Sequence, residues 1–190
     1  MVVMKTISNR IAVLFSLFCT AFVLAPKAYS GDTPVSWTVS NHLGKEVSSN
    51  SLAGKVTVVN FWATWCLPCL VEIPTLHDVA KEYGKDVAVV GISVDAKSNA
   101  MLKAFIDKFE MNYTVAMATP EILHSFRVGD EVPVTFILDQ QGRIVRKHVG
   151  YVEKEQLERE IRSVLSTSPT PPGRVALRPP GDKKSLPQSR

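Results

Sequence analysis

Residues 56–69 read VTVVNFWATWCLPC, and this stretch decides the fold. The β-branched run Val56–Asn60 follows a glycine and a lysine, which predicts a buried strand. Beyond Cys69 the apolar residues recur three or four positions apart, which is the spacing of one helix face. They are Leu70, Ile73, Leu76, Val79, Ala80 and Tyr83. The strand is therefore expected to give way to a helix over residues 66–83, with two cysteines at the junction.

Cys66 stands where this helix begins. Unpaired N–H groups and the helix macrodipole favour an anion there, so the pKa of the Cys66 thiol should be lowered and its thiolate available near neutral pH. Cys69 lies one turn later and can close a disulfide with it. The pattern predicts a redox dithiol in which Cys66 attacks and Cys69, the more buried thiol, resolves the mixed disulfide. The alternative is a purely structural disulfide.

Residues 58–69 resemble the active-site segment of thioredoxin-fold proteins. Glu72, three residues beyond the second cysteine, and Pro74 narrow the resemblance to the TlpA/ResA-like extracytoplasmic thiol–disulfide oxidoreductases, over residues 35–165. The resemblance implies an α/β thioredoxin fold, in which helices flank a central mixed sheet and residues 113–126 form part of a TlpA-like central insertion. It also implies that the chain is an enzyme, a protein-disulfide oxidoreductase.

The same resemblance points to a substrate-binding loop at Val132 and Pro133. Composition alone favours a trans bond before a proline that opens a strand. Thioredoxin-fold proteins place a cis proline here, facing the dithiol, so the resemblance implies that the Pro133 loop holds the substrate strand beside it. Trp65 is expected to shield the thiolate and to shape the substrate surface, with packing as its simpler alternative.

Glu72 has two interpretations. Its charge could merely complement the positive end of the helix. It could also lie near the thiols, raise their pKa and pass a proton in its protonated form. The resemblance favours the second role, since a Glu at this position is linked to the thiols in TlpA/ResA-like proteins. Thioredoxin itself has a buried Asp where this chain has Asn60. An amide cannot titrate, which makes Glu72 the candidate replacement.

Charge and cysteine content exclude several classes of protein. The formal net charge is +4, but residues 1–30 carry +3 and residues 168–190 carry +4, which leaves −3 for residues 31–167. The folded part therefore lacks the positive footprint of a nucleic-acid binder. Of three cysteines, Cys19 lies in the leader, so the remaining pair excludes a multi-disulfide framework and a four-thiolate zinc site. Leu70 follows Cys69 where haem attachment would need His.

Residues 1–30 read as a secretory signal peptide. A basic start precedes the uncharged run Ile11–Ala25, and Ala28 and Ser30 offer small residues before a cut. The run is short of the roughly 20 residues that span a bilayer, so cleavage is favoured over an uncleaved membrane anchor. Residues 31–167 form the predicted thioredoxin-like domain. Residues 168–190 form a disordered, basic, proline-rich tail that is solvated or weakly attracts anionic lipid or a partner.

Further elements are expected from hydrophobic periodicity and turn residues. Strands are predicted at 37–39, 87–94, 113–117, 132–138 and 143–149. Helices are predicted at 98–109, 120–126 and 153–165. Residues 40–54 are expected to form a turn and a polar loop. The scattered histidines are expected at the surface or in packing rather than as metal ligands, and these are His77, His124 and His148.

The sequence thus predicts an exported, periplasmic or extracytoplasmic oxidoreductase that needs no metal or organic cofactor. The resemblance implies reduction of disulfides in exported proteins, for example in cytochrome c maturation, with a membrane electron donor that recharges the dithiol. Three alternatives stay open. They are a disulfide oxidase or isomerase on the same fold, a copper-binding module that uses the two thiols and a His, and a peroxidase that would not depend on Cys69.

Overall fold

The computed structural model describes residues 33–167. The predicted leader with Cys19 and the predicted tail at 168–190 lie outside the described residues. Between residues 33 and 167 no helix combines the length and the apolar character needed to cross a bilayer.

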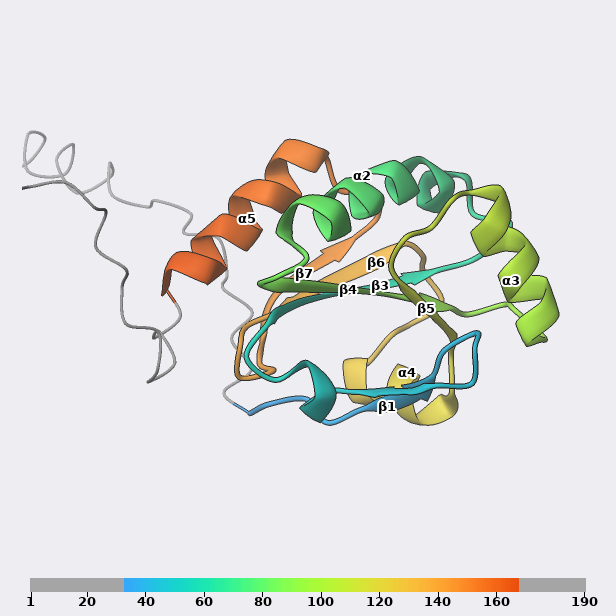
Figure 1. The fold of residues 1–190 in the computed structure, drawn as a ribbon, viewed down its shortest axis with the longest axis horizontal. Helices are drawn as coiled ribbons and strands as arrows, with labels where there is room; N and C mark the ends of the chain where they lie inside the picture. The colour runs from blue at the N-terminus through green and yellow to red at the C-terminus, as the bar shows by residue number, and fades with distance from the viewer. Residues whose placement is uncertain (1–32, 168–190) are drawn as a thin grey trace, which may run out of the picture.

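A five-stranded mixed sheet runs through the middle of the molecule in the order β5-β4-β3-β6-β7 (Figure 1). The strands are β3 (Val56–Trp62), β4 (Val87–Ser93), β5 (Thr114–Met117), β6 (Val134–Leu138) and β7 (Ile144–Val149). β3 pairs parallel with β4, and β4 pairs parallel with β5, whereas β6 pairs antiparallel with both β3 and β7. The expected central mixed sheet is therefore confirmed.

Each face of the sheet carries its own layer. Three helices lie on one face, namely α2 (Leu67–Tyr83), α3 (Asn99–Lys108) and α5 (Lys154–Thr167). The other face is covered by α4 (Pro120–Phe126), the hairpin of β1 (Thr38–Ser40) and β2 (Glu46–Ser48), and the single turn η1 (Asn50–Leu52).

Strand β3 divides the interior into two hydrophobic cores. All seven of its residues are buried. Because successive side chains of a strand point to opposite faces, Val58 and Trp62 pack under α2 and α3, while Val59 and Phe61 pack against α4. The continuous apolar run is thus explained by a strand covered on both faces.

The elements agree with the sequence prediction except in two places. Helix α2 runs through Pro74 to Tyr83, with Gly84 as its C-cap, and Ser98 caps α3 by accepting a hydrogen bond from the Met101 N–H. The segment after β1, expected as a polar loop, instead contains β2 and η1. Only Val47 of β2 is buried, so three residues give too little alternation to be recognised as a strand. Strand β6 begins after Pro133, because that proline has no N–H for the ladder.

Candidate active site

The two cysteines of the motif form a disulfide at the start of α2, with their Cα atoms 5.3 Å apart. Cys66 is the N-cap residue of the helix, and the Cys69 N–H donates to its Sγ at 3.3 Å. Sulfur thus occupies the place that a capping oxygen takes in other helices. If this geometry persists on reduction, the N–H and the helix dipole favour a thiolate on Cys66, as expected from the sequence.

Both sulfur-bearing residues are buried, with Cys66 3% and Cys69 2% exposed. The expected difference in burial between the two is therefore absent in the oxidised form. The cover over Cys66 comes in part from the 132–133 loop. By contrast, Trp65 is 70% and Leu67 71% exposed. A packing role for Trp65 is thus excluded, and two apolar side chains project into solvent on either side of Cys66.

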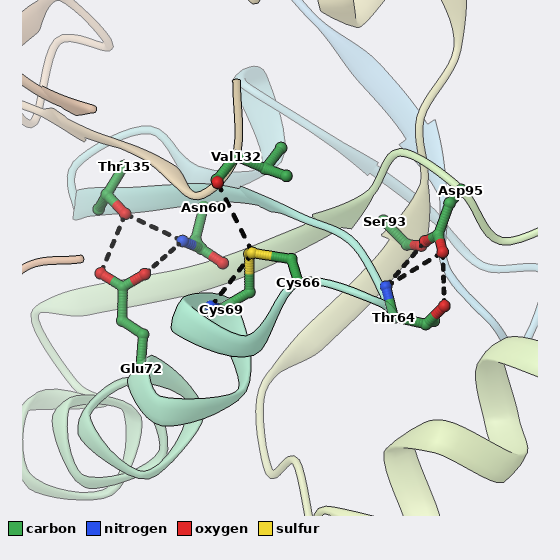
Figure 2. Close-up of a disulfide and its surroundings, with 9 residues drawn as sticks. All are labelled: Asn60, Thr64, Cys66, Cys69, Glu72, Ser93, Asp95, Val132 and Thr135. Carbon is green, nitrogen blue, oxygen red and sulfur yellow. Dashed lines mark hydrogen bonds between the residues drawn. A yellow bond between two sulfur atoms is a disulfide. The ribbon is translucent and has the colours of Figure 1, made fainter. Parts of the chain in front are cut away.

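The Val132–Pro133 peptide bond is cis, as the resemblance implied. The Val132 carbonyl oxygen lies 3.6 Å from the Cys66 Sγ (Figure 2). In the disulfide that sulfur carries no proton, so the approach is a contact rather than a hydrogen bond. The loop that precedes β6 therefore faces the first cysteine of the motif, and Pro133 is buried behind it.

Glu72 lies one turn beyond Cys69 and is fully buried. The Asn60 Nδ2 donates to the Glu72 Oε2 at 3.0 Å, and the Thr135 hydroxyl donates to its Oε1 at 3.3 Å. Burial raises the pKa of Glu72 to about 7, against the smaller lowering effects of the hydrogen bonds from Thr135, Asn60 and the backbone of Val152. Near neutral pH this carboxyl is therefore poised between its charged and neutral forms.

Two neighbouring strands of the sheet supply the side chains that position the Glu72 carboxyl. Asn60 of β3 and Thr135 of β6 are register partners, so their side chains emerge on the same face beneath α2. The Asn60 Nδ2 also donates to the Thr135 Oγ1 at 2.9 Å. Asn60 thus orients the Glu72 carboxyl, although its own amide cannot act as an acid. Figure 2 shows the three residues together on one side of the disulfide.

A second polar group lies on the opposite side of the dithiol in Figure 2 and was missed by sequence reasoning. It consists of Thr64, Ser93 and Asp95, joined by hydrogen bonds. Part of the signal was available, because Ser93 is the last residue of β4 and Asp95 follows it by two positions, while Thr64 follows β3 by two positions. Polar residues at the carboxyl ends of parallel neighbours meet at one edge of a sheet.

One histidine lies beside this site, because His148 of β7 is the register partner of Thr135. His148 pairs with Glu160 at 2.7 Å, and His77 lies 3.6 Å from Asp78. Among residues 33–167, no group of three or more His, Cys, Asp or Glu side chains is arranged to hold a metal ion. Figure 2 draws two polar groups beside the disulfide, that of Glu72, Asn60 and Thr135 and that of Thr64, Ser93 and Asp95, together with the Val132 carbonyl.

Comparison with known proteins identifies similar chains. The model of the AhpC/TSA family matches residues 31–147. Thiol-disulfide oxidoreductase ResA of Bacillus cereus is 30% identical over 155 residues, which is 80% of this chain and 88% of ResA. The structure of a thiol:disulfide interchange protein from Chlorobium tepidum superposes with a TM-score of 0.64 at 33% identity, covering 70% of this chain and 94% of that one. The exposed lipoprotein thioredoxin of Streptococcus pneumoniae gives a TM-score of 0.60 at 25% identity, covering 67% and 98%.

Proposed function

This chain belongs to the AhpC/TSA family, and from that premise we propose that it reduces disulfides of exported proteins outside the cytoplasm. It is a thiol–disulfide oxidoreductase of the ResA type, as the sequence resemblance implied. The observation that carries the proposal is the Cys66–Cys69 disulfide at the N-terminus of α2, facing the cis Val132–Pro133 loop.

The reaction is a two-step exchange of sulfur–sulfur bonds. In the reduced enzyme the Cys66 thiolate attacks one sulfur of a substrate disulfide. A mixed disulfide forms, and the other substrate sulfur leaves as a thiolate that takes up a proton. Cys69 then loses its proton and attacks the Cys66 sulfur, which releases the second substrate thiol. The substrate gains two electrons, and the enzyme ends in the disulfide form seen here.

Glu72 is proposed to accept the proton that Cys69 loses. The carboxyl follows Cys69 by one helical turn and has a pKa of about 7, which suits a group that must both take and return a proton at neutral pH. No other titratable side chain takes part in its hydrogen bonds with Asn60 and Thr135. We therefore expect Glu72→Gln to slow the second step more than the first.

The 132–133 loop and the exposed apolar residues are proposed to receive the substrate. An extended segment beside the cis Pro133 would bring its disulfide to Cys66, and Trp65 and Leu67 offer apolar contact on either side.

The place of action is inferred from the leader-like residues 1–30 and from the name of the exposed pneumococcal thioredoxin. In an oxidising compartment the Cys66–Cys69 disulfide must be reduced again after each turnover by an electron donor. We propose that this donor is a membrane protein. Unfolded exported chains with cysteine pairs, apocytochrome c among them, are the proposed substrates.

The experiment is mechanism-based trapping with the full chain. Cys69→Ser should accumulate a mixed disulfide between Cys66 and the substrate, because the resolving thiol is gone. Mass spectrometry of the trapped species would name the partner. Cys66→Ser is the matched control and should trap nothing and reduce no insulin disulfide. Full activity of Cys69→Ser without any trapped species would overturn the two-step scheme.

The direction of electron flow is tested by the reduction potential. A value near that of thioredoxin, about −270 mV, supports a reductase, whereas a value near about −120 mV marks an oxidant. The rival oxidase or isomerase on the same fold predicts the second result. A copper-binding module would instead show one tightly bound copper per chain.

A further inference from the structure

Asp95 is tied into the turn that leads to Cys66, on the side of the dithiol away from Glu72 (Figure 2). The Thr64 N–H donates to both carboxylate oxygens of Asp95 at 3.1 Å, and the Thr64 hydroxyl donates to Oδ2 at 2.5 Å. The Ser93 hydroxyl donates to the Asp95 Oδ1 at 3.0 Å and accepts from the Ala96 N–H. The position of Asp95 is thus held by the hydrogen bond from Ser93 in its own segment, and Asp95 holds Thr64 through three hydrogen bonds.

Thr64 attaches the turn before Cys66 to the rest of the protein. The Cys66 N–H donates to the Ala63 carbonyl at 3.2 Å, so Thr64 and Trp65 are the two central residues of a turn that ends on the first cysteine. Trp65 is 70% exposed and gives the turn no anchor in the core. The central part of the turn is therefore held to the protein through Thr64. Hydrogen bonds to a charged acceptor are the stronger kind.

We infer that Asp95 is a positioning residue for the dithiol, acting through Thr64. By holding the turn it keeps the Cys66 Sγ against the Cys69 N–H and beside the Val132 carbonyl, 3.3 and 3.6 Å away in the oxidised form. This role rests on the proposed function, since it is the exchange reaction that requires Cys66 to stay at the helix end. Asp95 itself makes no contact with either sulfur among the hydrogen bonds of the site.

A purely electrostatic role for Asp95 would have the opposite sign. A carboxylate that acted on Cys66 by its charge would disfavour the thiolate, so its removal would make the thiol more acidic. A carboxylate that acts by position keeps the sulfur at the helix N-terminus, where the thiolate is stabilised. Its removal lets the sulfur move away from that N–H, and the thiol becomes less acidic.

The test is the pH dependence of Cys66 alkylation in the reduced full-length protein, with the modified residue identified by peptide mass spectrometry. For Asp95→Ala we expect the midpoint to rise by about one pH unit, and the rate below the midpoint to fall about tenfold, because only the thiolate reacts and its fraction falls tenfold per unit there. Asp95→Asn keeps an acceptor for the Thr64 N–H, so its alkylation midpoint should lie between those of wild type and Asp95→Ala. Asp107→Ala removes the same charge from the exposed face of α3 and should match wild type.

Thr64→Val keeps the backbone donor and removes only the hydroxyl. It should shift the midpoint in the same direction by less, and it serves if Asp95→Ala does not fold, as judged by circular dichroism. A lowered or unchanged midpoint in a folded Asp95 or Thr64 variant would overturn the inference. Alkylation needs no substrate, so this result is independent of the proposed function, which fails separately if wild type reduces no protein disulfide and Cys69→Ser traps none.

Discussion

Replacing Glu72 by Gln should stabilise the oxidised protein in a pH-dependent way. In the folded state burial raises the pKa of Glu72 from 4.5 to about 7. An acid whose folded pKa is raised stabilises the fold only below its unfolded pKa, and this contribution is lost as pH rises toward the folded value. The window is therefore about pH 4.5 to 7. Above it, the fold carries the cost of an ionised carboxyl that is out of water.

The magnitude follows from the size of the shift. Each pKa unit corresponds to about 1.4 kcal/mol, so a shift from 4.5 to about 7 costs roughly 3 kcal/mol above pH 7. Gln has nearly the same shape, and its amide can still accept from Asn60 and reach the Thr135 hydroxyl. We therefore expect the stability gap between Glu72→Gln and wild type to be larger at pH 8 than at pH 4.5 by about 3 kcal/mol.

Urea unfolding at the two pH values measures the gap. The oxidised form is used because neither cysteine titrates while the disulfide is intact. Glu82→Gln removes an exposed carboxylate from the same helix and should give a gap near zero at both pH values. A Glu72→Gln gap of equal size at pH 4.5 and pH 8 would refute the reasoning, since it would mean that the buried carboxyl does not change its charge in this window.

Three further predictions concern the neighbours of this group and the rest of the fold. Thr135→Val removes a hydrogen bond that lowers the pKa of Glu72. That pKa should rise above about 7, which an NMR titration of the carboxyl carbon would detect. Trp65→Ala removes an exposed apolar side chain beside Cys66. It should lower kcat/KM for a protein disulfide several-fold and leave the rate with a small disulfide unchanged, and an equal loss for both would contradict a substrate-binding role. Leu157→Ala opens a cavity under α5 at a fully buried position and should cost about 2–5 kcal/mol in a denaturant titration.

The active-site helix and its strand were predictable because their signal is local. The β-branched run Val56–Asn60 predicts a buried strand, and the apolar spacing after Cys69 predicts one face of a helix. The position of Cys66 at the helix end follows from those two facts alone. The cis bond before Pro133 did not follow from composition, which favours trans. It came from the family resemblance, because residues far away in sequence decide which isomer the loop adopts.

The polar groups around the dithiol were less accessible to sequence reasoning. Glu72 was recognised as a candidate, but its partner Thr135 lies 63 positions later, and only strand register brings the two together. Asp95 lies 31 positions from Thr64, and no motif marks the pair. The equal burial of Cys66 and Cys69 was also unforeseen. Helix-end geometry predicts which sulfur is the more acidic, but the burial of Cys66 depends in part on the Val132 loop, 66 positions away in the sequence.

The sheet keeps the two hydrophobic cores apart, and both cysteines belong to the core beneath α2, α3 and α5. Opening the disulfide frees two side chains in that layer alone. The layer of α4, β1 and β2 meets the other face of β3 and contains no sulfur of the motif. Amide hydrogen exchange in the two redox states should therefore differ around α2 and remain alike in α4, which would mean that each catalytic cycle disturbs only one of the two layers.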